Sequence, residues 1–196
     1  MRDPLTGPGQ HRSRETGFTL LELLVTFTVA AILIAIAIPS LTVFVQNSRE
    51  DSQADSLLSS LAYARSEAVK RDANVVICSS SDGATCNGSS AWSTGWIVAT
   101  SGATPTVLQT MPQLDAGNTL SASFNGGGVS QLTFQPSGFV QAAAGSGVYL
   151  TTYFTLCDRR GASYARDIEV AATGGIQSSS TPGQTLGIPA QALVCP

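Results

Sequence analysis

The sequence is short of the residues that acid–base and metal chemistry need. Its 196 residues include one histidine, His11, and one lysine, Lys70, and charged residues make up 12% of the chain, about half the roughly 25% of a typical soluble domain. A nucleophilic triad therefore has a single candidate base, in an N-terminal tail. A histidine-rich metal site is excluded, and no GxxxxGK or GxGxxG segment is present to hold phosphates. We expect no enzyme activity and no cofactor.

Length and charge narrow the class of protein further. A chain of 196 residues suits one domain and an appendage. The 43% share of hydrophobic residues argues against a disordered polymer. The net charge of -3 gives no general attraction to nucleic acid, which basic clusters usually announce.

A long apolar run lies near the N-terminus, at residues 18–38. Only Thr19, Glu22, Thr26 and Thr28 interrupt it, and as a helix it would span about 31 Å, close to the hydrocarbon thickness of a bilayer. Arginines before the run and acids after it predict a cytoplasmic N-terminus and an exported C-terminal part. A secretory signal peptide would have a shorter core and a small-x-small cleavage site, neither of which is evident. We expect a retained transmembrane helix.

Glu22 is an unusual residue within this run. A charge at mid-membrane depth costs roughly 2.5–3.5 kcal/mol on insertion scales. One interpretation is that Glu22 lies near the boundary and reaches the interface, helped by the positive helix N-terminus. The other is that it pairs with a positive charge on a neighbouring molecule in a helical bundle.

The segment Gly17-Phe18-Thr19-Leu20-Leu21-Glu22 resembles the leader-peptide junction of type IV pilins and type II secretion pseudopilins. The resemblance implies that a prepilin peptidase removes residues 1–17 by cutting between Gly17 and Phe18 and then methylates the Phe18 amine. Glu22 would be the fifth mature residue, whose carboxylate neutralises that amine on an adjacent subunit. Pro39 matches a helix-bending proline of the family.

Helical periodicity continues from Leu41 to about Asp72, with apolar residues at three- and four-residue steps. Charges such as Glu50 and Glu67 are expected on the remaining faces. We therefore predict one long helix over residues 18–73, transmembrane over 18–38, which ends before Asn74.

Short segments rich in β-branched and aromatic residues follow the helix, separated by Gly, Asn, Ser and Pro clusters. Their close spacing leaves little room for crossover helices and favours a mainly antiparallel sheet. The predicted fold is α+β and, by the resemblance, pilin-like: a long N-terminal helix packed on a mainly antiparallel head over residues 74–196. A loop is expected over 178–192. The expected strands cover residues 75–78, 95–100, 106–111, 120–124, 132–135, 148–156 and 167–171.

The chain has four cysteines, an even number that favours disulfides in an exported protein. Four cysteines allow three pairings, and we predict Cys78–Cys86, which encloses the turn pair Asp82-Gly83, together with Cys157–Cys195. A structural zinc site is the rival, but the spacings lack CxxC pairs.

A second set of segments resembles the H-type minor pseudopilin domain shared by GspH and the minor pilins FimT and FimU. Trp92 and Trp96 fall within it, and we expect both to be core or edge aromatics. The segments are RSEAVKR at 65–71, VIC at 76–78, GWIV at 95–98, LTFQPSG at 132–138 and LCDRRG at 156–161.

Some FimT-type pilins bind DNA through a glycine-arginine-x-arginine motif. The matching segment here, Gly174-Gly175-Ile176-Gln177, lacks both arginines. A basic patch of Arg159, Arg160 and Arg166 would offer phosphate contacts. Acids interleave with these arginines in the sequence, so we expect a solvated surface of mixed charge there.

These observations predict a minor pilin of the bacterial inner membrane that helps to initiate or cap a type IV pilus, with its head in the periplasm and later in the pilus or pseudopilus. The expected partners are other major and minor pilins or pseudopilins, and the prepilin peptidase/N-methyltransferase; DNA is a doubtful partner. The alternatives are an H-type pseudopilin of type II secretion, a DNA-binding minor pilin of natural transformation and, more distantly, a membrane-tethered hydrolase.

Overall fold

The computed structural model of the protein describes residues 17–115, 117–141, 149, 151–186 and 195. The chain divides into two compact units, Met1–Val45 and Gln46–Pro196. One helix, α1 (Leu20–Arg71, 52 residues), runs through both.

Helix α1 begins two residues later than the apolar run, because Thr19 caps it. The Thr19 hydroxyl accepts the backbone N–H of Glu22 at 3.2 Å, which satisfies one of the N–H groups left free in a first turn. The helix ends where Asp72 adopts a positive φ of 50° and the Ala73 N–H bonds the Ala68 carbonyl at 3.2 Å. Both ends are therefore set by local backbone chemistry.

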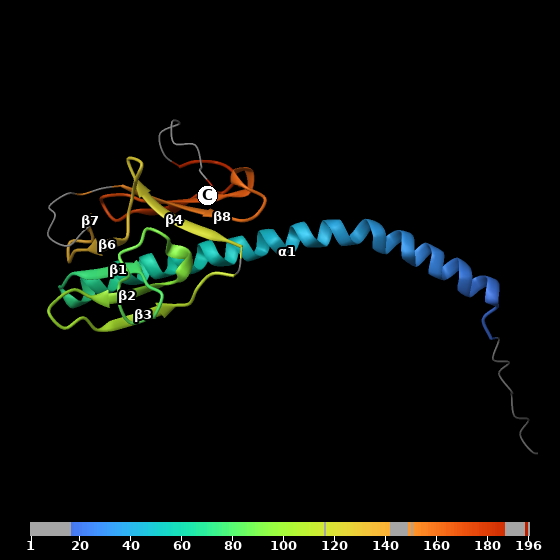
Figure 1. Ribbon diagram of the computed structural model, residues 1–196, viewed down its shortest axis with the longest axis horizontal. Helices are drawn as coiled ribbons and strands as arrows, with labels where there is room; N and C mark the ends of the chain where they lie inside the picture. The colour runs from blue at the N-terminus through green and yellow to red at the C-terminus, as the bar shows by residue number, and fades with distance from the viewer. Residues whose placement is uncertain (1–16, 116, 142–148, 150, 187–194, 196) are drawn as a thin grey trace, which may run out of the picture. The chain divides into compact units, whose positions relative to one another are not determined.

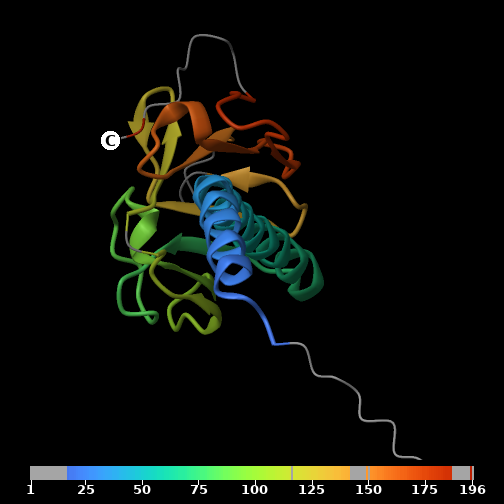
Figure 2. The same ribbon diagram turned by 90° about the vertical axis from the view of Figure 1, so that its right-hand side faces the viewer.

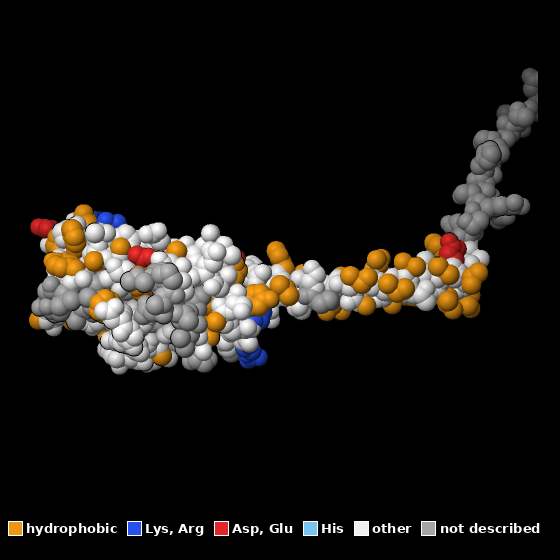
Figure 3. All heavy atoms as spheres, turned by 90° about the horizontal axis from the view of Figure 1, so that it is seen from above, with side chains coloured by type: hydrophobic (Ala, Val, Ile, Leu, Met, Phe, Trp, Pro, Cys, Tyr) orange, Lys and Arg blue, Asp and Glu red, His pale blue; other side chains and the backbone are white. Residues whose placement is uncertain are grey.

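The described part of the first unit, residues 17–45, is mainly exposed apolar helix. Its best 18-residue window has a mean hydropathy of 2.6 and none of it is buried within the protein, and Figure 3 shows apolar side chains along it. By length and composition this helix can cross a membrane. An apolar surface that runs around a whole helix requires an apolar environment, from lipid or from neighbouring helices.

The second unit, the head, holds two five-stranded sheets beside the helix (Figures 1 and 2). In the first sheet the strand order is β3-β2-β1-β6-β7, and all pairs are antiparallel. Its strands are β1 (Val75–Ser79), β2 (Trp96–Thr100), β3 (Val107–Met111), β6 (Gln131–Phe134) and β7 (Val140–Gln141).

The second sheet has the order β10-β9-β8-β4-β5 and is also antiparallel throughout. Its strands are β4 (Thr119–Phe124), β5 (Gly127–Gly128), β8 (Thr152–Cys157), β9 (Arg166–Val170) and β10 (Ile176–Ser178). Single-turn 3₁₀ helices, η1 (Trp92–Thr94) and η2 (Ala162–Tyr164), complete the head.

The expected α+β, pilin-like fold with antiparallel pairing is confirmed. All seven expected strands are present within a few residues of their predicted bounds, except that the first residues of 148–156 lie partly outside the described residues. The prediction missed β5, β7 and β10, because two or three residues are too few for a periodic signal. Ser178, expected to open a loop, ends β10, and residues 187–192 of that loop lie outside the described residues.

The core of the head forms between one face of α1 and the two sheets. Leu57, Leu61 and Ala64 are completely buried and belong to one cluster with residues of both sheets. Trp92 of η1 sits in this cluster: its Nε1–H donates to the Val129 carbonyl at 2.8 Å, and its ring meets Phe154 edge-on with centroids 4.9 Å apart. Trp92 therefore ties the sheets together, and the expectation that it is a core aromatic is confirmed.

Candidate functional sites

The N-terminal junction precedes α1. Gly17 and Phe18 are both exposed, Phe18 with 80% of its surface accessible, and residues 1–16 of the expected leader lie outside the described residues. A Cβ placed on Gly17 would meet no atom within 4 Å. The fold therefore has room for a larger residue at position 17, so packing gives no reason for glycine there.

Glu22 lies in the first turn of α1, where the helix dipole favours a negative charge. It is the only charged residue among residues 17–45, its side chain is exposed, and no described residue forms an ion pair with it. In an apolar environment this carboxylate would have no positive partner among the described residues of its own chain.

The structure pairs Cys78 with Cys86, with Cα atoms 5.6 Å apart. In the enclosed loop the Asp82 carboxylate accepts the N–H groups of Ala84 and Thr85 at 2.8 Å each, as well as the Thr85 and Ser80 hydroxyls. These hydrogen bonds, those from Thr85 first, hold the pKa of Asp82 well below its usual range. The loop is therefore closed by both a covalent bond and a local hydrogen-bond network.

Cys157 at the end of β8 pairs with Cys195, with Cα atoms 5.8 Å apart. This bond attaches the end of the chain to the second sheet. No free cysteine is present among the described residues. The same part of the chain offers no group of three or more His, Cys, Asp or Glu side chains placed to hold a metal ion.

Arg160, one of the three arginines of the suspected basic patch, is held inside a network of four partners. Its guanidinium donates to Asp158 at 2.5 Å, to Asn47 at 2.7 Å and to Glu50 at 3.0 Å, and it lies 4.2 Å from the centroid of the Tyr164 ring. Only 16% of the side chain is exposed. Arg160 therefore joins α1 to the segment after β8.

The other two arginines of that patch have different surroundings. Arg166 is 11% exposed and bonds the Asp51 carboxylate at 2.5 Å, whereas Arg159 is exposed and packs beside Gly117. Only Arg159 therefore presents its guanidinium to solvent. This differs from the solvated mixed-charge surface that we expected, because carboxylates of α1, more than 100 residues away in sequence, reach Arg160 and Arg166.

Glu50 is a buried residue that the sequence analysis placed on a solvent-facing side of the helix. It is 1% exposed, and its Oε1 has no hydrogen-bond partner among the described residues. Burial, and then repulsion from Asp158, outweigh attraction to Arg160 and Arg166 and raise the pKa of Glu50 to about 7. A signal was available: Glu50 precedes Ala54 in the buried stripe of α1 at the same three- and four-residue spacing. Glu67 is likewise buried, 6% exposed, and bonds Lys70 and Arg71.

These features define a class of protein. An apolar helical segment, preceded by a leader-like junction, continues into the core helix of an antiparallel, disulfide-bonded head. A model of the prokaryotic N-terminal methylation motif matches residues 12–38, which include Gly17, Phe18 and Glu22. The class is that of the pilin-like proteins with an N-terminal apolar helix.

The sequence of the head shows to which family the chain belongs. A family model described as type II transport protein GspH matches residues 53–174, which is more than half of the chain. The chain therefore belongs to the GspH family of minor pilins and pseudopilins.

Two solved structures of one protein share the fold at low sequence identity. Two crystal structures of the type IV minor pilin FimU of Pseudomonas aeruginosa each align with a TM-score of 0.52. The first is 21% identical and covers 66% of this chain and 91% of the FimU chain. The second is 22% identical and covers 70% of this chain and 98% of the FimU chain. The minor pseudopilin EpsH from the type 2 secretion system of Vibrio cholerae aligns with a TM-score of 0.48, at 13% identity over 67% and 96%. A comparison with curated protein sequences finds no match.

Proposed function

We propose that this protein is a minor pilin that is processed at the inner membrane, anchored there by its apolar helix, and built into a type IV pilus that it helps to initiate or cap. One observation carries the proposal. The GspH-family head follows an exposed apolar helix whose single charge, Glu22, stands five residues after Gly17. The proposed role is structural, without catalysis.

Processing would occur between Gly17 and Phe18, on the cytoplasmic side, and would remove residues 1–17 and methylate the new amine of Phe18. Exposure of both residues supports this proposal, because a peptidase needs an accessible, extended segment. The two disulfides support a head on the oxidising side of the membrane.

Glu22 would guide the subunit into the filament. The helix bundle inside a filament is apolar, and an unpaired carboxylate there is strongly unfavourable, whereas one that faces an ammonium group is compensated. The processed amine of Phe18 on an adjacent subunit is such a group. This contact forms only when the neighbour is aligned correctly, so it supplies registration as well as attraction.

The test combines intact mass with pilus yield. The membrane-extracted protein should have lost residues 1–17 and gained one methyl group. A clean deletion should lose sheared surface pili, and the native gene should restore them. A Gly17→Glu variant should stay uncleaved, whereas the head of that variant should melt as the native head does. An uncleaved native chain would refute the proposal.

The second candidate is the H-type minor pseudopilin of a type II secretion system, which the description of the matching family favours. Normal pilus yield in the deletion strain, together with loss of a secreted protein from the medium, would establish it. A role in DNA uptake has weaker support, because two of the three arginines that would serve it are held by carboxylates.

A further inference from the structure

The second sheet ends at β10, and the outer edge of this strand is open. On either side of the strand, the Gly175 carbonyl and the Ser179 N–H each bond the backbone of the hairpin arm that contains β9, at 2.8 Å. Antiparallel residues alternate between bonded and non-bonded pairs, so Gln177 is the residue of β10 that bonds β9. The N–H and C=O groups of Ile176 and Ser178 therefore point away from the sheet, and no described residue bonds them.

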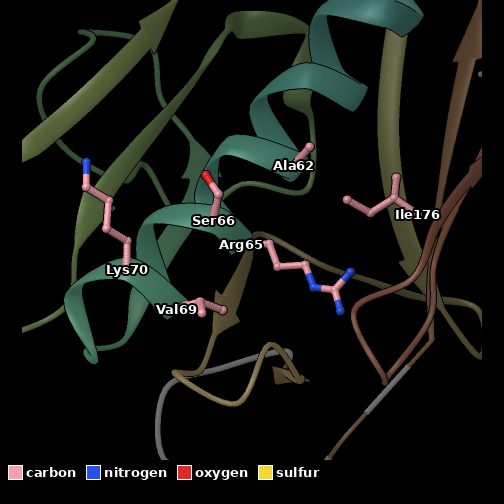
Figure 4. Close-up of a pocket in the computed structure, with 6 residues that line it drawn as sticks. All are labelled: Ala62, Arg65, Ser66, Val69, Lys70 and Ile176. Carbon is pink, nitrogen blue, oxygen red and sulfur yellow. The ribbon is translucent and has the colours of Figure 1, made fainter.

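Beside this edge, α1 leaves part of its surface uncovered by the sheets. A groove of about 640 Å³ lies there, which we call the β10 groove. Figure 4 shows the Arg65 side chain directed toward Ile176 across it, and Val69 adds apolar surface that is 55% exposed. A further strand beside β10 would therefore have a helix surface to pack on. The groove is lined by Ala62, Arg65, Ser66, Val69, Lys70 and Ile176.

The β10 groove is basic, and its arginine is unoccupied. No acid lines it, and no described residue forms a hydrogen bond or ion pair with Arg65. A Cβ placed on Gly138 or Gly174 would lie 3.2 or 3.1 Å from the Arg65 Nε, so these glycine turns leave room for the guanidinium and its five donors. Lys70 bonds Glu67 at 3.3 Å, but its side chain is 74% exposed and keeps other donors.

The two faces of the sheet differ in charge at this edge. Ile168 and Val170 of β9 are buried in the core cluster with α1, so Glu169 between them points to the opposite face by strand alternation. Glu169 lies opposite Gln177 of β10. An acidic side chain on an added strand would therefore be attracted to Arg65 on the helix side and repelled by Glu169 on the other.

We propose that the β10 groove binds an extended segment of a partner protein as an additional strand of the second sheet, with acidic side chains at alternate positions facing the helix. The free backbone groups of Ile176 and Ser178 would give affinity, as in other cases of strand addition. Arg65 would bind a carboxylate through two parallel hydrogen bonds. Residues 176–178 include no proline or lysine, which are residues that commonly block an edge strand.

The observations favour a polypeptide over a nucleic acid as the partner. Unpaired N–H and C=O groups in strand geometry match another strand, whereas binding of nucleic acid depends on many phosphate contacts, and this groove has two cations. The contact needs only the head, so it depends neither on leader removal nor on a place in a pilus.

Peptide binding to the full chain in detergent tests the proposal. The probe is a short fluorescent peptide in which aspartate alternates with valine, so that all its carboxylates share one face of a strand. Fluorescence anisotropy should show saturable binding. The same peptide with methylated backbone amides should not bind, because it cannot add as a strand, and asparagine in place of aspartate should weaken binding at least about fivefold. Absence of saturation up to about 1 mM, or equal binding of the methylated peptide, would overturn the inference.

Variants of the protein locate the contact. Arg65→Ala should weaken binding at least about fivefold, whereas Arg159→Ala, which removes another exposed arginine beside a glycine, should leave it unchanged. Ser178→Pro should abolish binding, because it removes an outward N–H that β9 does not use, and edge strands tolerate proline. Thermal unfolding checks that each variant is folded, and if Ser178→Pro is not, the two arginine variants decide.

Equal loss from Arg65→Ala and Arg159→Ala would overturn the inference, since it would show a general effect of charge. A single-stranded oligonucleotide that displaces the peptide from the native protein, and that fails to bind the Arg65→Ala variant, would also overturn it in favour of a nucleic-acid site.

Discussion

The two halves of α1 differ both in how much apolar side chain they carry and in what surrounds it. In the first unit Leu33 is 62% exposed, whereas Leu61 in the head is 0% exposed. The first half is apolar on every side, and the second is apolar along one stripe only. A sheet can cover one stripe but cannot surround a helix. The first half therefore needs lipid or other subunits to cover it, whereas the second is stabilised by its own chain.

The two halves also differ in where their charged groups find partners. The first half has one acid without a described partner, whereas the second has carboxylates bound by Arg160, which follows β8, and by Arg166 of β9. Electrostatic contacts are therefore internal in the head and, in our proposal, intermolecular in the anchor. Changes in the two halves should consequently affect different measurements.

The largest difference is expected for matched leucine truncations. Leu61→Ala should lower the free energy of unfolding of the head by about 2–5 kcal/mol, since it leaves a cavity in a closed core. Leu33→Ala should change it by less than about 0.5 kcal/mol. Thermal unfolding of the full chain in detergent, followed by near-UV circular dichroism, measures both. An equal loss from Leu33→Ala would show that the first half contributes to the stability of the head.

Removal of the disulfides should affect the head alone. On the loop-entropy model, replacing Cys157 and Cys195 by serine should cost about 4 kcal/mol, and replacing Cys78 and Cys86 about 2.5 kcal/mol, because the first pair closes a longer loop. Denaturant unfolding gives both values. Membrane extraction should be unchanged in either variant, and a reversed order of the two costs would contradict the model.

Arg160→Ala should destabilise the head by about 3 kcal/mol, because it leaves the buried Glu50 and Asp158 without their cation. Arg159→Ala is the matched control: that side chain is exposed, and its loss should cost less than about 0.5 kcal/mol. Equal effects of the two substitutions on urea midpoints would show that the network around Arg160 contributes nothing to stability.

The last expected effect concerns the pH dependence of stability, and it is spread over an interval of pH. The pKa of Glu50 is about 7 in the folded head and about 4.5 when unfolded, so the folded state binds the proton more tightly. The contribution of Glu50 to stability therefore falls as pH rises from 4.5 to 7, by up to about 3 kcal/mol. Asp158 and Asp51 face this group as acids, and Arg160 and Arg166 as cations.

Glu50→Gln isolates this effect, because the variant keeps the shape of the side chain and cannot titrate. The pKa of Asp167 is also raised, by burial, and those of Glu67 and Asp82 are lowered by hydrogen bonds, but these groups titrate in both proteins. The difference in unfolding free energy between native and variant heads should therefore change between pH 4.5 and 7. If this difference in unfolding free energy stays constant from pH 4.5 to 7, the pKa of Glu50 is not raised in the folded head.

Much of the molecule was determined by local sequence. The apolar run, the caps of α1, seven strands and the turn at Asp82 each depend on residues within a few positions of one another. The leader-like junction and Glu22 are also readable as a short, specific combination. Local patterns suffice for these features because helix periodicity, strand alternation and turn chemistry act over the same short distances.

The strand partners and the ion pairs depend on residues far apart in the sequence, and the tertiary structure sets them. It divided the strands between two sheets, since β1 pairs with β2 and β6 while β4 pairs with β8, and it brought Arg160 onto the carboxylate of the buried Glu50. It also removed Arg160 and Arg166 from the surface, but left Arg65 unbound beside two glycine turns. The same residue types receive different roles because burial and ion pairing are set by which segments the fold brings together, and sequence spacing does not contain that information.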